Sequence, residues 1–149
     1  MKLILVPRHI ERAGEVCDLL QQSGFYDMIM LSRINGGQQR NGESVIVIDV
    51  IGELFKFYSL ASVVYCGGSL VPRGGQNILE AAAWGKVIFY GPSMEDFSAE
   101  KDLLEGVGCG ITVGSEEELL KGITGLLAHP EEMKARGEKG KAVVLDHIG

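Results

Sequence analysis

Short runs of consecutive apolar residues alternate along this chain with segments whose apolar residues recur every three or four positions. Runs of four to six apolar residues, bounded by Gly, Pro or polar residues, are typical of strands buried on both faces. Segments with apolar residues at helical spacing are typical of amphipathic helices. The pattern predicts strands over residues 2–7, 28–32, 45–49, 63–68, 86–92 and 109–114.

Helical patterns follow most of these strands. Gly85 stands where a helix C-terminus favours glycine, and Ser115 with Glu118 has the spacing of a capping box. Gly137 and Gly140 weaken the last helical pattern, because glycine is a poor helix former. The predicted helices cover residues 10–24, 52–62, 77–84, 95–108, 115–129 and 130–148, and residues 33–44 are predicted to be a mobile polar loop.

Alternation of continuously apolar strands with helices predicts a parallel sheet with helices on both faces. This is a Rossmann-like α/β domain, and 149 residues suffice for a single domain with a buried core. In such sheets, ligands bind beyond the carboxyl ends of the strands. The segments of interest therefore follow the strands directly, at residues 7–9, 49–53, 67–77 and 90–97.

Composition narrows the classes of ligand. The net charge is −6 and Lys and Arg are scattered, which argues against a nucleic-acid partner, because phosphate neutralisation needs clustered positive charge. The cysteines Cys17, Cys66 and Cys109 lack metal-site spacing, so we expect them to be reduced and buried. No stretch approaches the ~20 apolar residues of a membrane span. We expect a soluble chain with no metal and no cofactor.

Residues 67–77, GGSLVPRGGQN, connect a predicted strand to a predicted helix and contain two glycine pairs. A glycine-rich connection lets the backbone approach a ligand closely. The N-terminus of the following helix offers unpaired N–H groups and a partial positive charge. These features suit an anion site, but the stretch fits equally well the alternative that Gly67, Gly68, Gly74 and Gly75 only turn the chain.

Glu80 has two interpretations. Asn77 and Glu80 have the spacing of a capping box, with Asn77 as the N-cap residue and Glu80 at position N3 of the helix. Alternatively, Glu80 accepts hydrogen bonds from a ribose diol, as acidic residues do in nucleotide-binding folds. The sequence leaves both interpretations open.

Two other strand ends carry candidate ligand-binding residues. The planar guanidinium of Arg8 can donate two parallel hydrogen bonds to a phosphate. The alternative role of Arg8 is a surface salt bridge with Glu11 or Glu15. Gly52 and Glu53 either contact a base or simply begin a helix. Together with residues 67–80, these groups suit a nucleotide bound at one edge of the predicted sheet.

These segments, in this order, resemble the C-terminal half of the 3-deoxy-D-manno-octulosonic acid (Kdo) transferases, which add Kdo to lipid A precursors. The resemblance spans most of the chain, and its most specific part is the block 67–97. It implies half of a GT-B glycosyltransferase, in which two Rossmann-like domains flank the active site. The matching stretches are VPRHIER (6–12), IGEL (51–54), GGSLVPRGGQNILEAAAWGK (67–86) and YGPSMEDF (90–97).

The resemblance also implies the donor, CMP-Kdo, and the residues that bind it. Arg73 and Gln76 are further candidates. The implied donor-binding residues are Pro7, Arg8, Ile51, Gly52, Glu53, Gly68, Ser69, Asn77, Ile78, Leu79 and Glu80. Gln76 stands where the family has a histidine, so an acid–base role at this position is in doubt. Ala81 and Ile10 stand where proline is frequent.

The resemblance implies that the general base, the acceptor site and the membrane anchor belong to an N-terminal half. We therefore expect residues 1–149 to be an excised CMP-sugar-binding domain that is inactive alone. The full enzyme would act at the cytoplasmic face of the inner membrane and invert the anomeric centre. The alternatives are a GT-B donor domain for a UDP- or ADP-sugar, and a non-catalytic module that binds a nucleotide or a protein partner. The absence of GxGxxG after the first strand argues against a dinucleotide.

Overall fold

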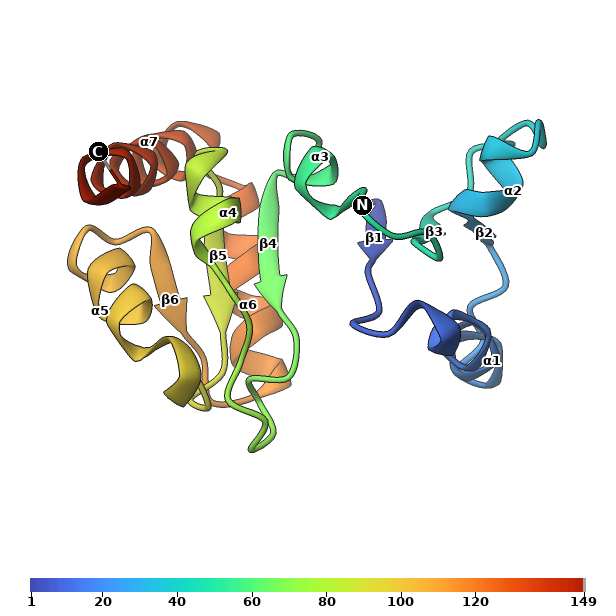
Figure 1. Cartoon of the computed structure of the whole chain (residues 1–149), viewed down its shortest axis with the longest axis horizontal. Helices are drawn as coiled ribbons and strands as arrows, with labels where there is room; N and C mark the ends of the chain where they lie inside the picture. Colours follow the sequence, from blue (N-terminus) through green and yellow to red (C-terminus); the bar gives the residue numbers. More distant parts are fainter. Residues whose placement is uncertain (149) are drawn as a thin grey trace. The chain divides into compact units, whose positions relative to one another are not determined.

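The computed structural model describes residues 1–148, which divide into two compact units. The first unit contains Met1–Leu54, and the second begins at Phe55. Each unit holds a three-stranded sheet (Figure 1). The six predicted strands are all present and their parallel pairing is confirmed. The sequence did not predict that they would pair in two groups of three.

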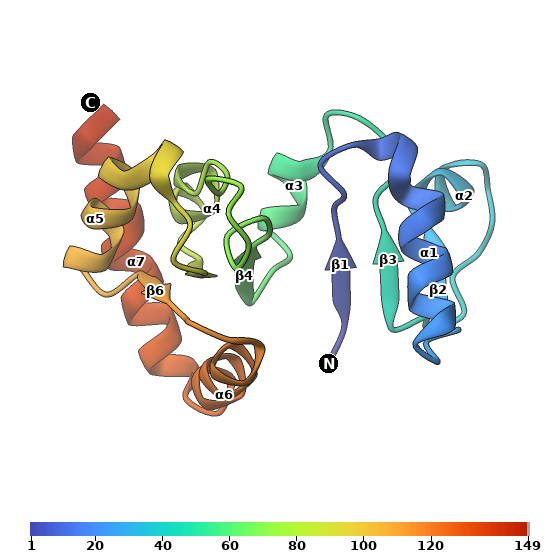
Figure 2. The same ribbon diagram turned by 90° about the horizontal axis from the view of Figure 1, so that it is seen from below.

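In the first unit, the strands lie in the order β1-β3-β2. The buried side chains of Val45 and Val47 in β3 pack with Ala13 and other apolar residues of α1, which covers this face of the sheet (Figure 2). The elements are β1 (Leu3–Leu5), the 3-10 helix η1 (Ile10–Arg12), α1 (Ala13–Gln22), β2 (Met28–Met30), α2 (Leu31–Asn35) and β3 (Val45–Val47).

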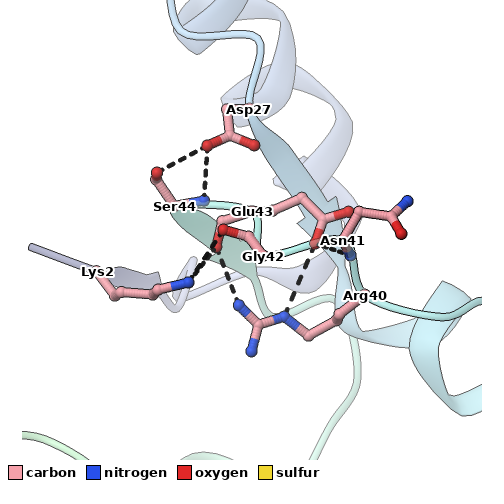
Figure 3. A network of polar contacts seen from close by, with 7 residues as sticks. All are labelled: Lys2, Asp27, Arg40, Asn41, Gly42, Glu43 and Ser44. Carbon is pink, nitrogen blue, oxygen red and sulfur yellow. Dashed lines mark hydrogen bonds and ion pairs between the residues drawn. The ribbon is translucent and has the colours of Figure 1, made fainter.

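The predicted loop over residues 33–44 is confirmed for residues 36–44, which form neither helix nor strand, but not for residues 33–35. The helix α2 occupies the start of this segment and the end of the preceding predicted strand. Polar contacts hold the other end of the segment (Figure 3): Lys2 Nζ donates to Gly42 O at 3.0 Å, and Ser44 Oγ donates to the Asp27 carboxylate at 2.7 Å. These contacts therefore hold the end of the segment against the residues that directly precede β1 and β2.

In the second unit, the strands lie in the order β4-β5-β6. Within β5, Ile88 and Tyr90 join a core with α4, α5 and α7, whereas Val87 and Phe89 join a core with α6. Figure 1 shows α6 and α4 on opposite sides of this sheet, so helices cover both of its faces, as predicted. The elements are α3 (Leu54–Tyr58), β4 (Val63–Cys66), α4 (Leu79–Ala83), β5 (Val87–Tyr90), the 3-10 helix η2 (Glu95–Phe97), α5 (Ser98–Gly106), β6 (Gly110–Thr112), α6 (Glu116–Leu127) and α7 (Pro130–Ile148).

Two buried glycines let α7 pack closely on the rest of this unit. A Cβ atom at Gly137 would collide with the backbone oxygen of Gly85, and a Cβ atom at Gly140 would collide with the Cys109 sulfur. Glycine lowers helix propensity, but this close approach leaves no space for a larger residue. Gly137 and Gly140, which were predicted only to weaken the last helix, therefore allow its close packing.

Candidate functional site

Residues 67–78 connect β4 to α4, and the buried residue Ser69 fastens the start of this connection to the end of β5. The Ser69 hydroxyl donates to Cys66 O at 2.5 Å and accepts from the backbone N–H of Gly91 at 2.8 Å. A Cβ atom at Gly91 would collide with the backbone of Ser69. The hydroxyl of this predicted donor-binding residue is therefore occupied by two backbone groups inside the protein.

The second glycine pair of the connection needs glycine for its backbone conformation. Gly74 and Gly75 have φ angles of 78° and 77°, a left-handed conformation that other residues rarely adopt. The Gly74 N–H donates to Ser93 Oγ at 3.0 Å. The Asp96 N–H donates to Gly74 O at 3.3 Å. The glycine pair is thus held by the segment that follows β5.

The start of α4 differs from the predicted capping box. The helix begins at Leu79 rather than at residue 77 and spans only five residues. Asn77 Oδ1 accepts from the N–H of Leu79 at 2.9 Å, which is the local turn that Asn side chains favour. The predicted bond from Asn77 to the N–H of Glu80 is not formed. The short helix also provides a smaller dipole than the predicted one.

The side chain of Glu80 is exposed, and it lies near Tyr58. Burial, and then the negative charge of Glu80, raise the pKa of Tyr58 to about 12. Tyr58 therefore stays protonated and uncharged at neutral pH. Among residues 1–148, the Glu80 carboxylate accepts no hydrogen bond.

The other candidates in the second unit lie along the same connection. Gly68 has a left-handed φ of 71°. Arg73 is exposed, and Gln76 is half-buried, with its backbone oxygen near the Cys66 thiol. The Ile78 side chain is only 1% exposed, so a ligand could reach its backbone but not its side chain. The connection thus brings these predicted residues together with residues 77–80.

The candidates in the first unit follow two neighbouring strands. Because β1 and β3 pair in parallel, Pro7-Arg8 and Ile51–Glu53 both lie beyond the carboxyl edge of this sheet. Ile51 is 82% exposed, and Gly52 has a left-handed φ of 84°. Asp49 anchors the segment before them, since its carboxylate accepts from the N–H and the hydroxyl of Ser32 at 2.8 and 2.5 Å.

Arg8 is exposed, and the predicted alternative, a salt bridge with Glu11 or Glu15, is not formed within residues 1–148. Arg12 Nε lies 2.9 Å from the Glu15 carboxylate, and His9 Nδ1 lies 3.8 Å from Glu11. Neither glutamate pairs with Arg8 within residues 1–148. Arg8 is thus an exposed residue that follows β1, beyond the carboxyl edge of the first sheet.

The cysteines are free thiols. Cys66 and Cys109 are buried and Cys17 is partly buried. Burial raises the pKa of all three, so their thiols are protonated at neutral pH.

In the described part of the chain, no three His, Cys, Asp or Glu side chains gather to hold a metal ion. No helix there has the length and apolar character to cross a bilayer.

Sequence reasoning missed the supporting role of residues 91–96. This segment contains Ser93, Glu95 and Asp96, which contact the glycine pair or one another. The available signal was the stretch YGPSMEDF, which was part of the family resemblance but had no function assigned to it. Hydrogen bonds between the two loops could not be predicted because they depend on how the chain packs.

No protein-family model matches the chain. The 3-deoxy-D-manno-octulosonic acid transferase of Aquifex aeolicus (strain VF5) is 34% identical over 143 residues, which are 96% of this chain and 38% of that protein. The protein of the same name from Chlamydophila psittaci is 35% identical over 143 residues, or 94% of this chain and 31% of that protein. The chain thus spans about a third of the length of these curated relatives.

A solved structure matches the fold over nearly the whole chain. It is the C-terminal CMP-Kdo binding domain of WaaA from Acinetobacter baumannii, with a TM-score of 0.85 and 29% sequence identity. The match covers 95% of this chain and 72% of that chain. The predicted Rossmann-like fold, the C-terminal half of a GT-B architecture, is confirmed.

Proposed function

We propose that this chain, which is homologous to the C-terminal part of the Kdo transferases, binds the CMP-Kdo donor of such an enzyme. The observation that carries the proposal is the match over 95% of the chain to a domain named for CMP-Kdo binding. The glycine-rich connection between β4 and α4 supports it, because its exposed backbone and polar side chains lie beyond the carboxyl end of a parallel strand.

In this proposal, Glu80 accepts hydrogen bonds from the ribose hydroxyls of CMP. A carboxylate accepts several hydrogen bonds and donates none, which suits a diol. Two observations support this role. The Asn77 side chain accepts from the N–H of Leu79 rather than from that of Glu80, and the Glu80 side chain is exposed. Backbone groups of residues 77–79 contribute further contacts to the nucleotide.

Arg8 stays a predicted ligand for a phosphate, and Arg73 stays a candidate for the carboxylate of Kdo. A guanidinium pairs with either anion through two parallel hydrogen bonds. Both arginines are exposed in segments that follow strands, Arg8 after β1 and Arg73 after β4. Pro7, Ile51, Gly52, Glu53, Gly68 and Gln76 stay predicted donor-binding residues. Ser69 was also predicted, but it is fully buried and its hydroxyl is engaged by two backbone groups, so it supports the loop in this structure.

In the full enzyme, a hydroxyl of a lipid A precursor attacks the anomeric carbon of Kdo with inversion. A base from another part of the protein accepts the hydroxyl proton while the new carbon–oxygen bond forms. The bond from the anomeric carbon to the phosphate oxygen breaks, and CMP leaves with its electron pair. The positive groups of this chain stabilise the charge that develops on the leaving phosphate. This chemistry takes place at the cytoplasmic face of the inner membrane.

A comparison of binding with turnover tests this division of roles. The chain should bind CMP in a calorimetric titration but should release no CMP from CMP-Kdo when a lipid A precursor is added. Transfer of Kdo by this chain alone would show that it holds the whole catalytic apparatus. Failure to bind CMP or CMP-Kdo would contradict the donor role itself.

A further inference from the structure

The glycine-rich connection needs support from outside itself. Residues 67–75 contain four glycines, and glycine has more backbone freedom in the absence of contacts than any other residue. A ligand that had to order such a loop would bind more weakly, because the lost freedom opposes binding. Contacts that order the loop before the ligand arrives therefore favour binding.

Residues 91–96 provide these contacts. A Cβ atom at Gly74 would collide with the Asp96 carboxylate, and a Cβ atom at Gly75 would collide with the Met94 sulfur. The side chains of Asp96 and Met94 therefore lie directly against the backbone of the glycine pair. The Asp96 N–H donates to Gly74 O, which closes one side of the contact.

Ser93 lies at the centre of this contact and is only 8% exposed. Its hydroxyl accepts from the N–H of Gly74 at 3.0 Å and donates to Glu95 Oε2 at 2.8 Å. Its own N–H donates to Ser69 O at 2.9 Å. One residue thus ties together both halves of the glycine-rich connection.

Glu95 fixes the direction of the Ser93 hydroxyl. Because the carboxylate accepts the hydroxyl proton, a lone pair of Ser93 Oγ is left to face the N–H of Gly74. A hydrogen bond from its own backbone N–H, and then the bond from Ser93, lower the pKa of Glu95. Glu95 therefore stays ionised at neutral pH and keeps this arrangement.

We propose that Ser93, oriented by Glu95, is a positioning residue for the donor nucleotide: it holds Gly74 so that residues 73–80 are arranged before the ligand binds. This inference rests on the proposed function, since the loop it positions carries Arg73, Asn77 and Glu80. Neither Ser93 nor Glu95 needs to touch the nucleotide.

The test combines amide hydrogen exchange of the ligand-free chain with calorimetric titration of CMP. Ser93→Ala and Glu95→Ala should each speed exchange at the Gly74 amide and raise the Kd of CMP about tenfold, the effect of losing one to two hydrogen bonds. Glu95→Gln should stay near wild type in both measurements, because its amide oxygen still accepts from Ser93. Glu95 is exposed, so its variants should fold even if Ser93→Ala does not.

Ser62→Ala is the matched control, because Ser62 is an exposed serine of the same unit outside both loops. It should leave exchange and Kd unchanged. Unchanged Gly74 exchange in Ser93→Ala and Glu95→Ala would overturn the proposed contact. Faster exchange with an unchanged Kd would overturn the positioning role while leaving the donor site intact. If the wild-type chain bound no CMP, the proposed function would fail first, and this inference with it.

Discussion

The Asn77 side chain accepts a hydrogen bond from the N–H of Leu79 at 2.9 Å, two residues further along the chain. This bond forms a local turn before α4, in place of a cap that would engage the N–H of Glu80. Glu80 therefore has an exposed carboxylate in the first turn of a short helix. The relationship shows that Asn77 does not form the predicted cap with the N–H of Glu80, and ribose binding stays the proposed role of Glu80.

Replacement of Glu80 should impair donor binding without a large loss of stability. Glu80→Ala removes hydrogen bonds between a charged group and the ribose, which contribute about 1.5–3 kcal/mol, so the Kd of CMP should rise roughly ten- to hundredfold. The melting temperature should change little, since exposed substitutions usually alter the free energy of unfolding by about 0.5 kcal/mol or less. Calorimetric titration and thermal melting measure the two quantities.

Glu116→Ala is the control for this prediction, because Glu116 is an exposed glutamate in the first turn of α6. It should leave CMP binding unchanged. If Glu80→Ala melted much lower than wild type and bound CMP equally well, Glu80 would be a structural residue of its helix.

The close packing of α7 predicts an unusual response to a glycine-to-alanine substitution. Alanine in a helix normally stabilises by about 1 kcal/mol relative to glycine. At Gly137, however, the added methyl group would collide with the backbone of Gly85, and overpacking costs about 1–3 kcal/mol. Gly137→Ala should therefore lower the free energy of unfolding in a urea titration.

Gly125→Ala is the matched control, because a Cβ atom at this position of α6 meets no atom within 4 Å. It should leave stability unchanged or raise it by up to about 1 kcal/mol. Equal stabilisation by both substitutions would show that α7 does not approach Gly85 as closely as the structure has it.

The buried thiol of Cys109 predicts a loss of stability at alkaline pH. Burial raises its pKa from 9.0 to about 11. Since the folded state holds the proton more tightly, the stability from this group is fully present below about pH 9. It is lost as the pH rises towards about 11. The shift corresponds to roughly 2–3 kcal/mol.

Urea midpoints measured between about pH 8 and about pH 11 test this prediction. Wild type should lose stability with rising pH, and Cys109→Ala should lose less, because it lacks the titrating thiol. Parallel curves for the two proteins would mean that Cys109 ionises equally in the folded and unfolded states.

The strands and their burial on both faces could be predicted, because each strand is marked by a run of consecutive apolar residues. The four consecutive buried residues of β5 indicate a strand covered on both faces. The helix α2 was missed because it depends on a contact distant in sequence, from Ser32 to Asp49. The packing of Gly137 was missed for the same reason, since Gly85 lies far from it along the chain.

In the candidate site too, features with a local sequence pattern could be predicted, and those that depend on distant contacts could not. Residues 77–80 were predicted from their place after a strand and from the family resemblance, but the bond from Asn77 to Leu79 depends on where the helix begins. Ser93 carried no signal of its own, because a serine in a loop is common. Its contact with Gly74 becomes visible only when the two loops are packed together.

The most direct test of the central claim is a competition titration of the chain with CMP, UMP, UDP and ADP. The cytosine-containing nucleotide should bind at least about tenfold more tightly than the others, a difference of about 1.4 kcal/mol. Tighter binding of UDP or ADP would assign the chain to a transferase with another donor. No detectable binding of any of the four nucleotides would contradict the account.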